Sequence, residues 1–393
     1  MGETIAAVEA FIVVVPREVP YLGPLRAGET VNARGYFVRR GNRSVYPTTD
    51  TSVLVKVTTA SGAIGWGECY AIVAPGAIAE IITDLLGPLM IGRDPRDPIP
   101  LHEDLYDTMR VRGFFGGYFV DALAGLDIAI WDVAARLADV PLCRLLGGRR
   151  HERLAAYVSG LPKATLAERC DFAVEWASRG FDAIKFAAAV AEEGEEAEMA
   201  ALRRALGPKV RIACDMHWKN TALAATRLID RMHVHDLWFA EAPVQPEDIE
   251  GQREVAAKAR TSIALGEEWR TAFEYRPRLI ARCMDVIQPE MAHTGVTEFM
   301  KIGRMAEAFH CRNIPHASIG IGIFQAASLQ ASVALQNCDG HEYQHSIFDR
   351  NLRFLEGDMM ACKDEFYQLP SGPGLGVSPG PEVWRYARRH EPA

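Results

Sequence analysis

Three acidic residues recur at one interval in the middle of the chain. Glu241 lies 26 residues after Asp215, and Glu267 lies 26 residues after Glu241. Each acid ends a short apolar run that is typical of a buried strand. Segments predicted to be helical, residues 223–232 and 249–259, lie between the runs. A strand, a helix and two short loops need about this many residues, so the interval predicts successive βα units with an acid at the same place in each.

The carboxyl ends of the strands in a βα barrel meet at one mouth, where we expect the three acids to converge. Three ionised carboxylates repel one another, and they stay ionised together only around a cation. All the candidate ligand atoms are oxygens, and no Cys or second His is obviously involved, which favours Mg2+. The sequence therefore predicts a Mg2+ site formed by Asp215, Glu241 and Glu267.

An imidazole accompanies the first of these acids, because His217 lies two residues after Asp215. Side chains alternate along a strand, so the two side chains are expected to point the same way. That arrangement would place a proton-transfer group beside a metal ligand. The alternative is a strand end with a capping Asp and a surface His, and the recurrence of the acidic pattern favours the first interpretation.

The composition is that of a large globular protein. The 393 residues are 49% hydrophobic with a formal net charge of −8, which suits one large domain and a smaller one. An acidic chain without basic clusters argues against nucleic acid or an anionic membrane as a partner. The 8 Cys form no Cys-x-x-Cys pair and indicate a reducing compartment. The apolar run 11–15 is too short to span a membrane and follows no basic segment, so we expect no signal peptide and a cytoplasmic protein.

Residues 1–130 do not follow the βα interval and are predicted to form an α+β domain. Strands are expected at residues 5–15, 51–58 and 63–69, and helices at residues 76–89, 100–106 and 118–137. The long segment 17–50 between two strands is typical of a lid or a specificity loop. Arg39, Arg40 and Arg43 in this segment could bind a substrate carboxylate, and solvated surface arginines are the alternative.

Several motifs resemble one known family. ALAGLDIAIWD from Ala122 to Asp132, followed by Pro141 and by LLGG from Leu145 to Gly148, resembles the signature of the mandelate racemase and muconate lactonising enzyme group of the enolase superfamily. GWGE from Gly65 to Glu68 resembles the N-terminal hairpin of that group, and GPGLGVSP from Gly372 to Pro379 resembles its C-terminal closing segment. The motifs span essentially the whole chain in the order of the family.

The resemblance implies an α/β fold of the modified TIM-barrel type, (β/α)7β, under an α+β cap. Residues 1–130 would form the cap, residues 131–355 the barrel, and residues 356–393 a segment that packs back on the cap. The other barrel strands are expected at residues 153–159, 181–186, 285–290, 312–316 and 341–343. Glu290, His316 and Glu342 continue the interval of 26 residues, so their side chains are also expected at the mouth.

The resemblance also implies residue roles. The family removes the proton α to a carboxylate, and Mg2+ stabilises the enediolate that forms. Asp215, Glu241 and Glu267 match its metal ligands, and His316 matches its base on strand seven. The partner of that base in the family is an Asp on strand six, where this chain has Glu290 and, after it, one residue fewer than the usual form. A structural histidine and a structural acid are the alternatives for His316 and Glu290.

Three further residues match family positions. Lys185 matches the first Lys of a Lys-x-Lys motif whose second position is Ala187 here. The missing second Lys argues against a two-base racemase and leaves Lys185 as a contact for the substrate carboxylate, or as the partner of a barrel acid. Glu342 matches an acid that can hydrogen-bond the carboxylate, and a structural acid is its alternative. The Asp215-x-His217 motif resembles dehydratases of the galactonate type, in which the His protonates the leaving hydroxyl. The alternative is that His217 only holds a neighbouring site residue in place.

These roles predict a Mg2+-dependent dehydratase of a sugar acid, a lyase that converts a 2,3-dihydroxy acid to a 2-keto-3-deoxy acid. An epimerase, racemase or cycloisomerase of the same superfamily is the first alternative, and a barrel that binds without catalysis is the second. The expected partner is a small carboxylate substrate, and a homo-oligomer is expected because relatives are often multimers.

Overall fold

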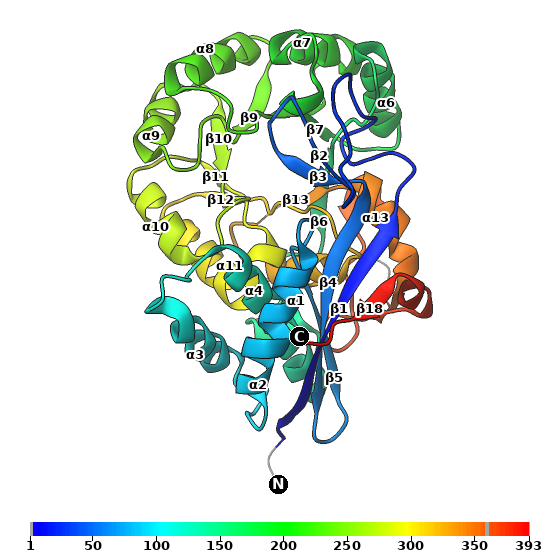
Figure 1. Ribbon diagram of the computed structural model, residues 1–393. Helices are drawn as coiled ribbons and strands as arrows, with labels where there is room; N and C mark the ends of the chain where they lie inside the picture. The colour runs from blue at the N-terminus through cyan, green and yellow to red at the C-terminus, as the bar shows by residue number, and fades with distance from the viewer. Residues whose placement is uncertain (1–2, 339, 358–360, 393) are drawn as a thin grey trace.

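An antiparallel sheet contains strands from both ends of the chain (Figure 1). The computed structural model describes residues 3–338, 340–357 and 361–392. The sheet order is β18-β1-β4-β5, with bounds β1 (Ile5–Pro16), β4 (Thr49–Thr59), β5 (Ile64–Cys69) and β18 (Ala387–Arg389). Alternation along β4 gives the sheet two apolar faces: Val53 and Val55 face one core, and Leu54 faces another. The three N-terminal strands expected from the sequence are thereby confirmed.

Helices cover the face of the sheet that carries Val53 and Val55. They are α1 (Pro75–Glu80), the π-helical turn η1 (Ile81–Leu86), α2 (Gly87–Met90), α3 (Pro98–Arg110) and α4 (Gly117–Leu137). Two glycines allow α4 to lie directly on β5. A Cβ atom on Gly67 would lie 1.9 Å from the carbonyl oxygen of Gly125, and one on Gly125 would lie 2.2 Å from Sγ of Cys69. This close approach explains the small residues in both motifs.

The larger part of the molecule alternates strands and helices (Figure 1). Within the described residues, eight parallel strands are separated by seven main helices, which is the order (β/α)7β. The strands are β6 (Leu154–Ser159), β7 (Ala183–Ala187), β8 (Arg211–Asp215), β9 (Leu237–Glu241), β10 (Ser262–Leu265), β11 (Val286–Ile287), β12 (Arg312–Asn313) and β13 (Gly340–Tyr343). The helices are α6 (Leu166–Ser178), α7 (Glu195–Leu206), α8 (Ala222–His233), α9 (Ile249–Lys258), α10 (Ala272–Ile280), α11 (Met291–Ala308) and α12 (Ile323–Ser332).

The strands run side by side from β12 through β6, and β13 pairs with β6. Between β13 and the segment after β12, the backbone N–H of Glu342 donates to the carbonyl of Pro315 at 3.2 Å. The predicted fold class, a cap over a barrel-like α/β domain, is confirmed. Strands six and seven are shorter than expected, because Pro289 and Pro315 cannot donate to the backbone ladder and the regular pairing ends before them.

The barrel interior holds one layer of apolar side chains, which pack as a single cluster. Its members come from neighbouring strands and are Tyr157, Ala183, Ala213, Phe239, Ala264, Val286 and Ile314. Side chains of a strand face the same way every second residue, so the positions two residues further on face the same interior nearer the carboxyl ends. Those positions include Lys185, Asp215, Glu241, Gln288 and His316. The polar layer thus rests directly on the apolar one.

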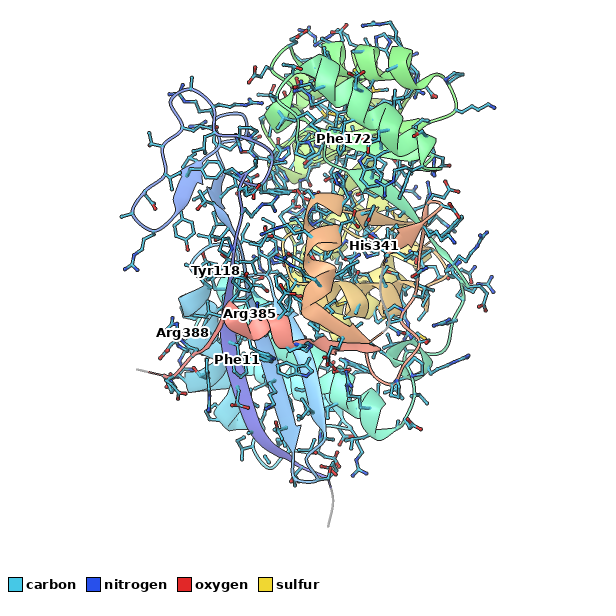
Figure 2. The ribbon with its side chains drawn as sticks, turned by 90° about the vertical axis from the view of Figure 1, so that its right-hand side faces the viewer. Phe11, Tyr118, Phe172, His341, Arg385 and Arg388 are labelled. Atoms are coloured by element: carbon cyan, nitrogen blue, oxygen red, sulfur yellow. The ribbon has the colours of Figure 1, made fainter. Side chains whose placement is uncertain are left out.

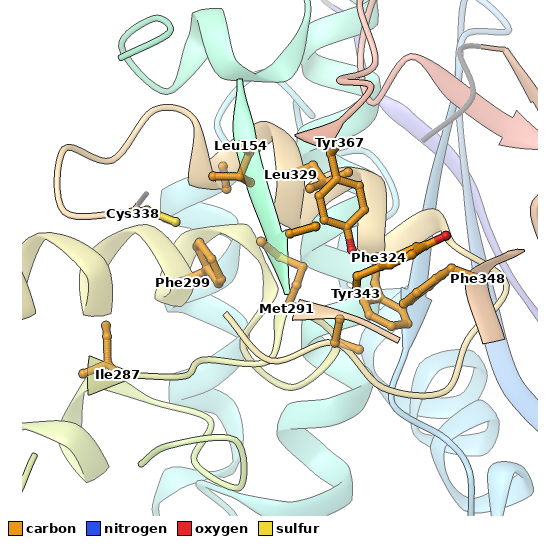
Figure 3. Packing of buried hydrophobic residues seen from close by; sticks show 14 of the residues in the cluster. Leu154, Ile287, Met291, Phe299, Phe324, Leu329, Cys338, Tyr343, Phe348 and Tyr367 are labelled. Carbon is orange, nitrogen blue, oxygen red and sulfur yellow. The ribbon is translucent and has the colours of Figure 1, made fainter. Parts of the chain in front are cut away.

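The outer faces of the strands are covered by helices. Figure 3 shows Leu154 of β6 and Ile287 of β11 within a cluster that also holds Met291 and Phe299 of α11 and Leu329 of α12.

Across the described part of the chain, no helix has both the length and the apolarity needed to cross a membrane.

Glu68 at the end of β5 joins the cap to the barrel. Its buried carboxylate accepts backbone N–H groups from residues 321–324, including Ile321 at 2.6 Å and Ile323 at 2.9 Å. Ser52 also donates to it, at 2.7 Å. Burial raises the pKa of Glu68 although these donors oppose the shift. The start of α12, and the loop before it, are therefore fixed by a residue of the cap.

Two acids of α4 make further connections. Asp127 accepts the backbone N–H and the hydroxyl of Thr297 on α11, at 2.9 and 2.7 Å. Asp132 accepts the N–H of Trp66 and the N–H of Leu375, both at 2.8 Å. The predicted boundary at residue 130 lies inside α4, a helix that contacts both parts of the molecule. The division into residues 1–130, 131–355 and 356–393 stays a prediction.

The end of the chain returns to the first strand. β18 pairs with β1, with Arg388 opposite Ile12, and the ring of Trp384 meets that of Phe11 edge-on at 5.2 Å between centroids. Figure 2 shows Phe11 beside the segment that carries Arg385 and Arg388.

Candidate active site

The three acids at the 26-residue interval meet at the barrel mouth. Asp215 and Glu241 are the last residues of the adjacent strands β8 and β9 and are paired in register. Glu267 follows β10 by two residues. One carboxylate oxygen from each acid lies within 4.8 Å of those of the other two. The structure therefore brings together the three residues predicted as metal ligands, which we call the acid triad.

The ammonium group of Lys185 and the amide group of Gln288 contact the triad. Nζ of Lys185 lies 2.7 and 2.8 Å from the two carboxylate oxygens of Glu241, and 3.0 Å from Oε1 of Glu342. Burial opposes the charge on Lys185, but these carboxylates outweigh burial and raise its pKa well above the usual value. The pairing of Lys185 with barrel acids, one of the two interpretations of the sequence, is what the structure shows. Gln288 donates to Oε2 of Glu241 at 2.6 Å.

The triad is nevertheless short of positive charge. Burial, together with the charge of Glu267, raises the pKa of Asp215 to about 7. Burial raises the pKa of Glu241 to about 8 even though Lys185 opposes the shift. Burial also disfavours charge on Glu267, but His316 outweighs it and lowers its pKa to about 2. A divalent cation between the carboxylates would hold all three ionised, so these oxygen donors fit a hard cation such as Mg2+.

His316 lies between two acids. Its Nδ1 is 2.9 Å from Oε2 of Glu290, and its Nε2 is 2.7 Å from Oε2 of Glu267. The same Glu290 oxygen accepts the backbone N–H of Ser318 at 3.0 Å, which fixes the carboxylate. Burial would lower the pKa of His316, but Glu267 and Glu342 raise it well above the usual value. Glu290 thus reaches the imidazole from a position past the end of β11.

His217 lies beside Asp215 for a different reason from the one expected. β8 ends at Asp215, and the chain then turns through left-handed conformations at His217 (φ 52°) and Trp218 (φ 53°). The turn, rather than alternation along a strand, brings Nδ1 of His217 to 3.1 Å from Oδ2 of Asp215. Burial lowers the pKa of His217. The two side chains lie together as expected, but the reason given for it, alternation along one strand, is wrong.

A cavity of about 250 Å³ opens over these groups. Asp215, Glu267, His217 and His316 line it from the barrel side. The cap side of the wall includes Tyr21, Ser44, Val45 and Tyr46 from segment 17–50, together with Tyr70 and Ile72. The predicted loop therefore does border the cavity, as a segment that includes the hairpin β2 (Tyr36–Val38) and β3 (Val45–Pro47). Lys185 and Glu342 line a narrower adjoining space with His217 and His316.

The arginines of this segment do not line the cavity. The Arg39 side chain is fully buried, and its guanidinium donates to Glu29 at 2.9 Å and to the backbone carbonyls of Tyr21, Gly23 and Pro24. Its donors hold the segment together, which corrects the expectation that Arg39 binds substrate. Arg40 and Arg43 are exposed, and neither is among the residues that border the cavity.

Sequence reasoning missed several polar residues at the site, among them Gln288, Tyr46, Trp218 and Glu268. Gln288 lies two positions before Glu290, and alternation along predicted strand six would have found it. Tyr46 belongs to an irregular segment with no periodic signal. Trp218 and Glu268 directly follow His217 and Glu267, beyond the strands, where no repeating pattern sets side-chain direction. Burial raises the pKa of Glu268 to about 8, and the charge of Glu267 adds to the shift.

Comparison with known proteins agrees with this geometry. The model of the mandelate racemase / muconate lactonizing enzyme N-terminal domain matches residues 44–147, and that of the enolase C-terminal domain-like family matches residues 168–383. The chain belongs to this family. Membership confirms the predicted resemblance to the enolase superfamily. The relatives that are named dehydratases confirm the prediction of an enzyme of the lyase type.

Similar proteins within the family differ in their named activities. The chain is 31% identical to a D-gluconate dehydratase of Thermoproteus tenax over 83% of this chain and 68% of that protein. It is 30% identical to a D-galactarolactone cycloisomerase of Agrobacterium fabrum over 83% of this chain and 88% of that protein. A crystal structure from Sinorhizobium meliloti, described provisionally as an isomerase, superposes with a TM-score of 0.97 at 55% identity, covering 98% of this chain and all of that one.

Proposed function

We propose that this protein is a Mg2+-dependent dehydratase that removes water from a sugar acid. The observation that carries the proposal is the placement of two imidazoles on different carboxylates of one acid triad. His217 contacts Asp215 at 3.1 Å, and His316 contacts Glu267 at 2.7 Å. Dehydration of a 2,3-dihydroxy acid needs a base for the α-proton and an acid for the departing hydroxyl, and two separate imidazoles supply one of each.

His316 is the base in this proposal. Glu290 accepts from Nδ1 and so keeps a proton on that nitrogen. A cation on the triad would compete with the imidazolium for Glu267, and loss of the Nε2 proton would then leave that nitrogen free to act as the base. Nε2 then takes the proton from Cα of the substrate. Mg2+ bound to Asp215, Glu241 and Glu267 would stabilise the negative charge that develops on the substrate carboxylate.

Lys185 and Glu342 bind the substrate carboxylate. Nζ of Lys185 lies 3.0 Å from Oε1 of Glu342, so one oxygen of a carboxylate could accept from the ammonium beside that acid. The N–H of Ala317 donates to Oε2 of Glu342 at 2.8 Å, which fixes the glutamate side chain. Ala187 follows Lys185 by two residues on β7, so this strand presents no second lysine as an opposite-face base.

His217 is the acid that protonates the leaving hydroxyl. Its backbone N–H donates to Oδ1 of Asp215 at 3.0 Å and its ring lies against the other oxygen, so the imidazole is held at one position on the cavity wall. The product of base-assisted loss of water would be a 2-keto-3-deoxy acid after the enol rearranges.

The test is incubation of the Mg2+-loaded protein with a panel of aldonic and aldaric acids that includes D-gluconate. Formation of a 2-keto acid, detected by the ultraviolet absorbance of its semicarbazone, supports dehydration. The matched control is the His217→Asn variant, which is expected to form product about 10²- to 10⁴-fold more slowly. Absence of product across the panel, with Mg2+ bound, would overturn the proposal.

An epimerase or cycloisomerase is the second candidate, because two of the similar proteins carry isomerase names. The same base would remove the same proton in either case. Solvent deuterium at Cα of recovered substrate, without formation of a 2-keto acid, would favour this candidate over the dehydratase.

A further inference from the structure

Two polar side chains on the cavity wall lack partners. Both carboxyl oxygens of Glu268 and Nε1 of Trp218 are buried, and none of the three atoms has a hydrogen-bond partner among the described residues. Both residues border the 250 Å³ cavity. Buried polar atoms in native proteins are nearly always paired, so a donor and two acceptors without partners on one cavity wall point to a bound polar molecule.

The two side chains belong to the same side of the cavity as His217. Trp218 is the next residue after His217, and the two rings meet edge-on at 6.1 Å between centroids. The indole N–H of Trp218 is close enough to the carboxyl of Glu268 to lower the pKa of that group against the effect of burial, but the two groups do not meet the geometry of a direct hydrogen bond. His316 and Glu290 come from the segments after β12 and β11, outside this group. Trp218 thus adjoins the proposed acid, and Glu268 lies with Trp218 although it directly follows Glu267, which contacts the proposed base.

The order of atoms in the proposed substrate fits this layout. The carbon that loses its proton faces His316, and the next carbon, which loses its hydroxyl, faces His217. A carbon chain that continued past His217 would meet the part of the wall formed by Trp218, the next residue, and by Glu268. A hydroxyl group is the chemical group that suits both partners, because it can accept from the indole N–H and donate to a carboxyl oxygen at the same time.

We propose that Glu268 and Trp218 together bind a hydroxyl group of the substrate that lies beyond the two reacting carbons. This assignment rests on the proposed function, and it narrows the substrate to polyhydroxy acids of at least four carbons. Glu268 and Trp218 are then residues that set specificity by recognising the length and hydroxylation of the chain.

The experiment compares two ligands that differ in this part of the molecule. D-Gluconate has hydroxyls beyond the reacting carbons, and glycerate (2,3-dihydroxypropanoate) has none. Both are titrated calorimetrically into the full-length, Mg2+-loaded protein in a His316→Asn background, which prevents turnover. The variants are Glu268→Leu, which removes both oxygens at similar size, Glu268→Gln, which keeps one acceptor, and Trp218→Phe. Glu247→Gln, an exposed residue that does not border the cavity, is the matched control.

The readout is the ratio of the dissociation constant for gluconate to that for glycerate. We expect this ratio to rise about tenfold in Glu268→Leu, because a buried hydrogen-bonding group loses its partner. It should rise less in Glu268→Gln and stay at the parent value in Glu247→Gln. Trp218→Phe should raise the ratio as well, which keeps the test open if Glu268→Leu fails to fold.

The outcomes separate this assignment from the function it rests on. Equal weakening of both ligands in Glu268→Leu and Trp218→Phe would show a structural role and overturn the assignment while leaving the dehydratase proposal standing. An unchanged ratio in both variants would do the same. If the parent protein binds neither acid and forms product from no acid of the panel, the proposed function falls and the assignment falls with it.

Discussion

Nε2 of His316 lies 2.7 Å from Oε2 of Glu267, so the proposed base is ion-paired to a proposed metal ligand. Each partner shifts the other, because burial disfavours both charges but Glu267 raises the pKa of His316 and His316 lowers that of Glu267. A cation on the triad would compete with the imidazolium for the charge of Glu267. Binding of metal and loss of the proton from the base are therefore linked events.

The first prediction follows from this linkage. Asp215 and Glu241, with pKa values raised to about 7 and about 8, must give up protons before they can bind Mg2+. Mg2+ binding at pH 7 should therefore release protons, and its affinity should increase as the pH rises from about 6 to about 8. Calorimetry in buffers of different ionisation enthalpy measures the released protons. Asp215→Asn should weaken binding strongly, and an affinity independent of pH would contradict the linkage.

The two imidazoles should be separable by substitution. His316→Asn removes the base, so both deuterium uptake at Cα and product formation should fall by about 10²- to 10⁴-fold. His217→Asn removes only the acid, so product formation should fall by a similar factor while deuterium uptake persists. Proton NMR in D2O follows exchange and product in the same sample. Equal loss of both processes in the two variants would contradict the division of roles.

Glu290 should act through His316 rather than on the substrate. Its carboxylate accepts from Nδ1 of His316 and from the N–H of Ser318. Glu290→Gln keeps the size but weakens the acceptor, so kcat should fall about tenfold or more with little change in KM. The apparent pKa of the base in the kcat profile should also fall. A change confined to KM would show instead that Glu290 contacts the substrate.

Glu68 should control stability and the loop before α12. Replacing it by Ala leaves the backbone N–H groups of residues 321–324 without their acceptor in a buried site. Glu68→Ala should lower the free energy of unfolding by about 3 kcal/mol, as measured by urea titration. Glu103→Gln, at an exposed position of α3, is the control and should change it by less than about 0.5 kcal/mol. Equal stability of the two variants would contradict the tether.

His341 should make the fold sensitive to acid. Burial lowers its pKa from 6.5 to about 4, and its ring contacts Oγ of Ser328 and the carbonyl of Glu342. Between these pKa values the unfolded chain binds a proton that the folded chain does not, so stability is present above pH 6.5 and is lost as the pH falls toward 4. Urea unfolding at pH 7.5 and pH 5 should show a smaller loss for His341→Gln than for the parent protein. The same loss in both would place the acid sensitivity elsewhere.

Regular elements made most of the fold predictable. Alternation and helical periodicity depend only on which residues face a core, and the 26-residue interval of Asp215, Glu241 and Glu267 reflects the length of one βα unit. These signals identified the strands of the cap, the repetition of βα units and the convergence of the triad, and the full barrel order came from the resemblance to the family. The bounds of β11 and β12 were overestimated, because Pro289 and Pro315 end the backbone pairing while the chain still runs toward the mouth.

Positions outside regular elements were predictable only in part. His217 reaches Asp215 through a left-handed turn, which the assumption of strand alternation does not describe. Arg39 is turned inward by Glu29 and by backbone carbonyls of its own segment, and no local pattern in the sequence reveals such partners. Glu268 and Trp218 lie past the strand ends, where side-chain direction is set by tertiary packing alone. The residues that line the cavity from loops are therefore harder to predict from the sequence than the acids at the strand ends.

The pairing of β18 with β1 has a consequence for protein engineering. The sheet order β18-β1-β4-β5 unites strands from the two extremes of the polypeptide, so no single uninterrupted fragment contains the whole of that sheet. A chimera that places the cap of a relative on this barrel must therefore exchange two separate stretches of the chain together. A chimera with a single crossover would pair β18 of one parent protein with β1 of the other.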